Sequence, residues 1–154
     1  MTTSKLFSFC ALAALVLTGC ESSTEPVVND VPNVPSMWEG RPVQVLGTIT
    51  VQSSDVIFLT WDSGNLIDGD IISLVVNDRV VLSEYELLGP GNKLELPVTF
   101  EFLGFNYVLL FAHNEGDVPP NTAALSVDDG VTVQELILRA DLETNGAYNV
   151  RVLN

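Results

Sequence analysis

Alternation of apolar and polar residues is the feature that most limits how this chain can fold. A period of two places successive side chains on opposite faces of an extended strand, so one face of each strand can be buried. The clearest example is residues 94–102, where every even position is apolar and the odd positions hold Glu95, Pro97, Thr99 and Glu101. Because Pro97 has no amide hydrogen for a sheet ladder, we expect this strand at a sheet edge or at a bulge.

Similar segments, separated by turn residues, follow one another from Val43 onward. We expect further strands over residues 43–52, 56–61, 71–76, 80–85, 107–113, 123–127, 131–140 and 147–153. Residues 107–111 are apolar at both even and odd positions, which indicates a central strand covered on both faces. The pattern of 131–140 changes phase near Gln134 and Glu135, which predicts a bulge there.

Together these segments predict an all-β fold. A chain of 154 residues has room for one domain with a single core beside a targeting segment. About eight or nine short strands, with turns rich in Gly, Asn and Asp between them, are typical of an antiparallel β-sandwich. We therefore expect one sandwich, of immunoglobulin-like or jelly-roll-like kind.

The N-terminal segment predicts export. Lys5 precedes an apolar run over residues 6–17, and about a dozen apolar residues are too few for a transmembrane helix, which needs about twenty. The run ends in Leu17-Thr18-Gly19-Cys20, which resembles the lipobox of bacterial lipoprotein precursors. The resemblance implies cleavage before Cys20 and a diacylglyceryl group on its thiol. In the alternative interpretation, Cys20 is only a small residue of a secretory or membrane segment.

The segment after the anchor has the composition of a linker. Residues 21–42 are rich in Ser, Pro and Asn and show no sustained apolar period, which is typical of an extended tether. We therefore divide the chain into a cleaved signal peptide (1–19), a lipidated cysteine with a flexible tether (20–42) and a β-sandwich domain (43–154). Trp38 is expected to pack on the flank of the domain, the alternative being an exposed ring that stacks on a ligand.

The charge balance limits the partners. Acidic residues outnumber basic ones by 20 to 6, and the net charge is −14. Such a chain repels phosphate backbones, so we expect no nucleic-acid partner. Membrane attachment must then come from the lipid on Cys20. We therefore expect the domain in the cell envelope and, if the cell is Gram-negative, at the outer membrane, facing either the periplasm or the exterior.

One loop is a candidate metal site. Asp62, Asn65, Asp68 and Asp70 lie close together between two expected strands, and Gly64 and Gly69 stand among them. Calcium takes about six to eight oxygen ligands from flexible loops of this composition, so Ca²⁺ is the candidate cofactor. The spacing differs from that of the EF-hand loop and lacks its terminal Glu. The alternative is a turn that needs no ion, since Asp, Asn and Gly also form turns alone.

A second polar loop follows the strand over 107–113. Its candidate ligand-binding residues are His113, Asn114, Glu115, Asp117 and Asn121. A histidine could act as a general base or metal ligand, but the sequence has no Gly-x-Ser-x-Gly elbow, no mature cysteine nucleophile and no His-Glu-x-x-His pair. We therefore expect a structural or exposed His113 and a protein that is not an enzyme.

Three segments resemble a small β module of secreted and envelope-anchored bacterial proteins: residues 68–78, 114–125 and 140–147. The resemblance covers most of residues 61–152 and implies an extracytoplasmic β fold, with no catalytic residue. We expect a lipid-anchored β-sandwich that binds a protein or glycan ligand in the envelope. The alternative is a structural or accessory lipoprotein that docks onto another envelope component.

Overall fold

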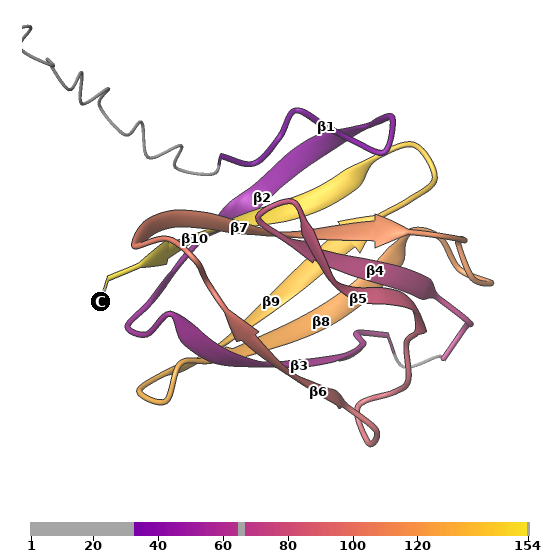
Figure 1. Cartoon of the computed structure of the whole chain (residues 1–154). Helices are drawn as coiled ribbons and strands as arrows, with labels where there is room; N and C mark the ends of the chain where they lie inside the picture. The colour runs from indigo at the N-terminus through magenta and orange to yellow at the C-terminus, as the bar shows by residue number, and fades with distance from the viewer. Residues whose placement is uncertain (1–32, 65–66, 154) are drawn as a thin grey trace, which may run out of the picture.

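The computed structural model describes residues 33–64 and 67–153, which form ten strands and no helix (Figure 1). All nine expected strands are present, and β1 is additional. The strands are β1 (Met37–Trp38), β2 (Arg41–Val51), β3 (Asp55–Asp62), β4 (Ile71–Val76), β5 (Arg79–Glu86), β6 (Leu94–Thr99), β7 (Gly104–Ala112), β8 (Asn121–Asp128), β9 (Val133–Ala140) and β10 (Asn145–Val152). No helix of the described residues is long and apolar enough to cross a membrane.

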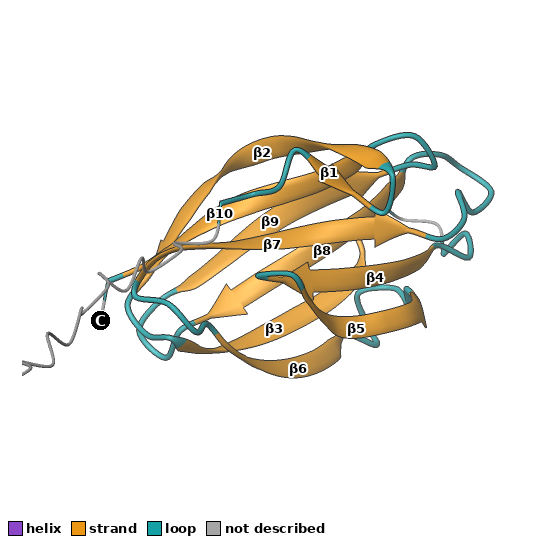
Figure 2. Cartoon of the chain, turned by 45° about the horizontal axis from the view of Figure 1, so that its top comes forward, coloured by secondary structure: helices purple, strands orange, loops and turns teal. Residues whose placement is uncertain are grey.

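The strands form two facing layers, so the expected β-sandwich is confirmed (Figure 2). One sheet has six strands in the order β1-β2-β10-β7-β4-β5, and the other has four in the order β6-β3-β8-β9. One pairing departs from the expected antiparallel pattern, because β10 runs parallel to β2 with a register shift between Ala147 and Tyr148. Side-chain alternation is the same in parallel and antiparallel strands, so the sequence pattern could not reveal this direction.

The centre of β7 is covered on both faces, as the apolar sequence of residues 107–111 predicted. Val108 and Leu110 join the main core between the sheets, whereas Tyr107 and Leu109 belong to a second cluster on the outer face of the six-stranded sheet. Trp38 packs against this second cluster, so its expected position on the flank of the domain is confirmed. Complete burial of an aliphatic side chain such as Leu109 or Leu110 contributes about 1.5–3 kcal/mol to the stability of the fold.

The four-stranded sheet tests two further predictions. Pro97 lies in β6, whose strand partner is β3, so the expected edge position is confirmed. The bulge predicted at Gln134 and Glu135 is wrong, because β8 and β9 pair without a register shift. The apparent change of phase came from Val131 and Val133, apolar side chains that are 73% and 62% exposed.

Strand pairing begins before residue 43, where the domain was expected to start. Val43 donates its amide to the carbonyl of Ser36 over 3.0 Å, and Trp38 pairs with Arg41. Burial of Trp38 and Val34 against the second cluster explains why this polar, proline-containing segment is ordered. The expected signal peptide and Cys20, the expected lipidation site, lie outside the described residues.

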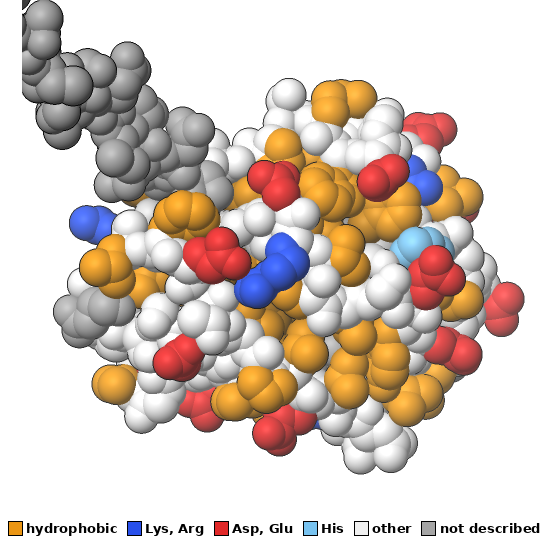
Figure 3. Space-filling model, in the orientation of Figure 1, with side chains coloured by type: hydrophobic (Ala, Val, Ile, Leu, Met, Phe, Trp, Pro, Cys, Tyr) orange, Lys and Arg blue, Asp and Glu red, His pale blue; other side chains and the backbone are white. Residues whose placement is uncertain are grey.

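The surface reflects the acidic composition. Figure 3 shows red carboxylate side chains spread over one face, with few blue basic groups between them. An ion pair between Arg79 and Glu101, at 3.6 Å, joins two exposed side chains. Exposed pairs of this kind contribute at most about 1 kcal/mol, so packing of the two sheets dominates stability.

Candidate metal centre

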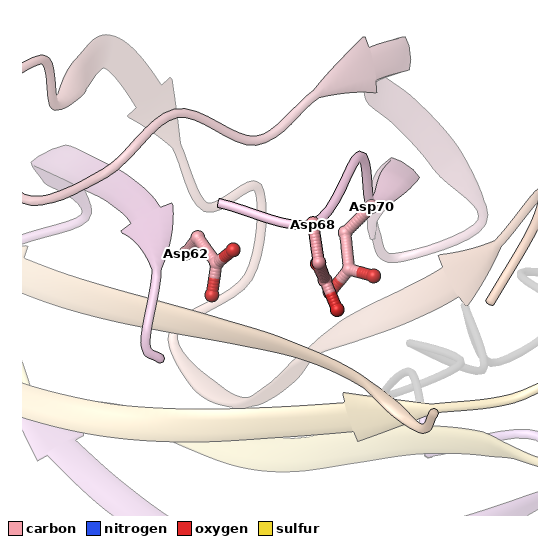
Figure 4. Close-up of side chains that lie close together, drawn as sticks. All are labelled: Asp62, Asp68 and Asp70. Carbon is pink, nitrogen blue, oxygen red and sulfur yellow. The ribbon is translucent and has the colours of Figure 1, made fainter. Parts of the chain in front are cut away.

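Three aspartates converge where the chain crosses between the sheets. Asp62 ends β3 in the four-stranded sheet, and Asp68 and Asp70 precede β4 in the six-stranded sheet. Figure 4 shows the carboxylates of Asp68 and Asp70 side by side, with Asp62 across from them. One oxygen from each lies within 4.8 Å of the others. Asp62 and Asp70 are only 3% and 2% exposed, so this group is largely shielded from water.

Each carboxylate uses one oxygen to bind the backbone. Asp62 Oδ1 accepts the amide of Gly64 at 2.8 Å, Asp68 Oδ2 accepts that of Val118 at 3.0 Å, and Asp70 Oδ2 accepts that of Thr122 at 3.1 Å. The second oxygen of each carboxylate is buried without a hydrogen-bond partner among the described residues. These three oxygens have no partner within residues 33–64 and 67–153 and could coordinate an ion.

Buried oxygens without partners are concentrated at this place. Within 33–64 and 67–153 there are five such side-chain oxygens, of which three belong to the aspartates and one to Asn121; the fifth is Asn145 Oδ1. A buried acceptor without a partner costs about 1–3 kcal/mol, and more if it is charged. A group of them is therefore expected to have another ligand. The three aspartates could hold a metal ion, whereas the fourth expected ligand, Asn65, lies outside the described residues.

The electrostatics of the site favour a cation. Burial, with smaller contributions from the charges of Asp68 and Asp62, raises the pKa of Asp70 from 3.8 to about 6 against the opposing hydrogen bond from Thr122. Like charges placed close together in a shielded site destabilise each other's ionised form. A bound divalent cation would reverse this effect, because it would be the largest charge in the site.

The second candidate loop closes over the first. Asn114 joins them directly: its Oδ1 accepts the amide of Ile71 at 2.8 Å, and its Nδ2 donates to the carbonyl of Gly69 at 2.7 Å. Asp117 donates its amide to the carbonyl of Asp68 at 3.0 Å. The two loops that the sequence analysis treated separately thus form one unit.

Gly116 makes this closure possible. A Cβ at this position would lie 2.6 Å from Asp70 Oδ1, and its φ of +54° lies in the left-handed region. Glycine is therefore the residue that fits here without strain. Neither Glu115 nor Asp117 adds its carboxylate to the group formed by the three aspartates, so their part in the candidate site is the backbone of the loop.

His113 points to a different surface. Its Nε2 lies 2.8 Å from Ser73 Oγ, and its ring meets that of Phe111 edge to face at 5.0 Å. Both residues line a shallow groove of about 230 Å³ on the six-stranded sheet, together with Trp38 and Glu39. Figure 3 shows the histidine, in pale blue, beside apolar side chains. Ser73 and Glu39 could not be predicted from the sequence as neighbours of this groove, because only the folded sheet brings them to the same place as His113.

Comparison with known proteins adds no assignment. No protein-family model matches this chain, and neither the curated proteins nor the solved structures contain a match.

Proposed function

We propose that this protein is a lipid-anchored, non-enzymatic binding module of the bacterial cell envelope, with a loop pair that Ca²⁺ holds together. The observation that carries the proposal is the group of unpartnered buried oxygens on Asp62, Asp68 and Asp70. Oxygen ligands favour hard cations, and Ca²⁺ tolerates the irregular geometry of loops better than Mg²⁺, which needs near-octahedral coordination. His113 contacts Ser73 and not the three aspartates, so the site has no imidazole ligand that would favour a softer metal.

The groove beside His113 is the ligand-binding surface in this proposal. Trp38 and Phe111 offer aromatic rings, and Glu39, Ser83 and His113 offer polar groups along its walls. Apolar rings with a few convergent polar groups suit a sugar ring or a short peptide. A volume of about 230 Å³ is small, which favours one sugar unit or one side chain over a larger ligand.

A binding role is better supported than catalysis. The Ser73 hydroxyl, in a side chain only 6% exposed, already accepts the amide of Glu84 at 3.0 Å while it contacts His113. This pairing fixes the imidazole at the edge of the groove. A nucleophilic serine would instead have to reach a substrate with its oxygen.

The metal part is tested on the mature chain carrying Cys20→Ser, which removes the lipid. After chelation, calorimetric titration with CaCl₂ is expected to show one binding site. Thermal unfolding with calcium present is expected to show a raised melting temperature. Calcium at about 100 times its Kd would add about 2.7 kcal/mol to the free energy of unfolding. Asp128→Asn, a change at the end of β8, is the matched control and should bind as wild type does. No heat and no shift in the wild type would exclude the site.

The anchor and the ligand need separate experiments. In cells, Cys20→Ser is expected to move the protein from the membrane fraction to the soluble fraction and to remove the mass of the lipid. A glycan array probed with and without calcium tests the groove, with Trp38→Ala as the variant expected to lose signal. If membranes instead yield one protein partner in constant ratio and the array yields none, an accessory subunit is the better description.

A further inference from the structure

We propose that Asn121 supplies an amide-oxygen ligand to the same cation, which makes the ion a clasp between the two loops. This inference rests on the proposed calcium site. The unpartnered oxygen of Asn121 is independent of the three carboxylates, since it lies on a different strand and carries no charge. Amide oxygens are regular ligands of Ca²⁺.

The register of the sheet places Asn121 beside Asp62. Asp62 of β3 is paired with Ala123 of β8, so both side chains point to the same face of the sheet. Ala123 belongs to the main core, which identifies that face as the interior. Asn121, two residues earlier, points to the same face as a diagonal neighbour of Asp62. It is fully buried, with 0% exposure.

The hydrogen bonds of Asn121 fix which end of its amide is left available to a cation. Its Nδ2 lies 3.5 Å from the carbonyl of Ile71 and 3.5 Å from Asn114 Oδ1. Rotation of the amide by 180° would set an oxygen against these two acceptors and is therefore unfavourable. The carbonyl end, Oδ1, has no partner in the part of the chain that the structure describes. The adjacent residue, Thr122, binds Asp70 Oδ2 through its amide at 3.1 Å, so the chain at Asn121 also adjoins Asp70.

Ligation by Asn121 would have a structural consequence. Asn121 begins β8 and thereby ends the loop that starts after Ala112, the last residue of β7. The aspartates belong to the crossing from β3 to β4. A cation bound to both segments would hold the second loop closed and protect the amides of Asp117 and Val118, which donate to Asp68.

The test compares two buried asparagines. Asn145 is also fully buried with an unpartnered Oδ1, but its Nδ2 donates to the carbonyl of Trp38, toward the opposite face of the six-stranded sheet. Calcium titration of the mature chain carrying Cys20→Ser is repeated with Asn121→Ala and with Asn145→Ala. We expect Asn121→Ala to weaken calcium binding roughly tenfold or more, because an oxygen ligand is lost. Asn145→Ala should leave the affinity within about twofold, since these sites share no partner.

A third variant keeps the test decisive if alanine at 121 prevents folding. Asn121→Asp retains an oxygen at the site and adds a negative charge, so it should bind calcium at least as tightly as wild type and be less stable in chelator. Hydrogen exchange at residues 114–118 should slow with calcium in wild type. Wild-type affinity in Asn121→Ala, or loss of binding in Asn121→Asp, would overturn the role of Asn121 alone. Absence of calcium binding in the wild type would instead refute the metal site itself.

Discussion

Replacement of Asp70 by asparagine separates two effects on stability. One is the destabilisation by a buried negative charge when calcium is chelated, and the other is the stabilisation by bound calcium. Asp70→Asn keeps the shape of the side chain and an oxygen that can accept the amide of Thr122. It removes the negative charge that burial and the neighbouring carboxylates of Asp68 and Asp62 disfavour. We therefore expect the variant to be more stable than wild type in chelator and to lose the response to calcium.

The magnitude follows from the pKa of Asp70. A rise from 3.8 to about 6 corresponds to roughly two pKa units, or about 3 kcal/mol at about 1.36 kcal/mol per unit. The raised pKa stabilises the folded state fully below about pH 4, and this stabilisation is lost as the pH rises through about 6. The advantage of Asp70→Asn should thus be near zero at about pH 4 and reach up to about 3 kcal/mol at about pH 7.5.

Urea unfolding of the mature chain with Cys20→Ser, in EDTA at both pH values, measures this difference. A gain of about 3 kcal/mol would raise the melting temperature by roughly 10 °C for a domain of this size. Excess calcium at about pH 7.5 should then stabilise wild type and leave Asp70→Asn unchanged. Lower stability of Asp70→Asn than of wild type in EDTA at that pH, or an equal gain from calcium in the two proteins, would refute this role of Asp70.

Three other substitutions test single features. Gly116→Ala should lower stability by about 1–3 kcal/mol and weaken calcium binding, because its Cβ would lie 2.6 Å from Asp70 Oδ1. Unchanged stability and calcium affinity would show that the loop accommodates the added methyl group. Tyr107→Phe should cost about 1–2 kcal/mol in urea unfolding, since the buried hydroxyl donates to Asp78 Oδ1 and accepts the amide of Asp78, each at 2.7 Å. Burial opposes ionisation of Asp129, but hydrogen bonds from three backbone amides and a hydroxyl lower its pKa overall. The ionised carboxylate therefore contributes stability above about pH 4 that is lost as pH falls, so Asp129→Asn should cost about 1–2 kcal/mol near neutral pH and less in acid; a constant deficit would contradict this.

Most strands could be predicted because their alternation reports burial directly. In β6 the polar positions face solvent, and in β7 residues 106–110 are all buried, so both the edge and the centre of the fold were visible in the sequence. The predictions failed where apolar side chains are exposed or where a strand is too short to show a period. Val131 and Val133 are apolar yet exposed, and β1 has only two residues, too few for any period.

The candidate site was predictable only in pieces. Asp62, Asp68 and Asp70 are close in sequence, so their composition already indicated a cation. Asn121 is more than fifty residues from Asp62, and its place in the site depends on the pairing of β3 with β8. No spacing rule connects such residues, because strand order is decided by the packing of the whole sandwich.

The position of the loops gives the proposed clasp its physical purpose. The chain crosses from the four-stranded to the six-stranded sheet between β3 and β4, and crosses back between β7 and β8. Since β4 pairs with β7 and β3 pairs with β8, the two crossings lie at the same end of the sandwich. Small extracytoplasmic domains are often stabilised by disulfides. The two cysteines of this chain are Cys10 and Cys20, and processing as a lipoprotein would leave no pair to form one. A cation shared by the two crossings would brace the sheets at that end. The stability of the domain should then depend on calcium, and chelation should open this end before the core.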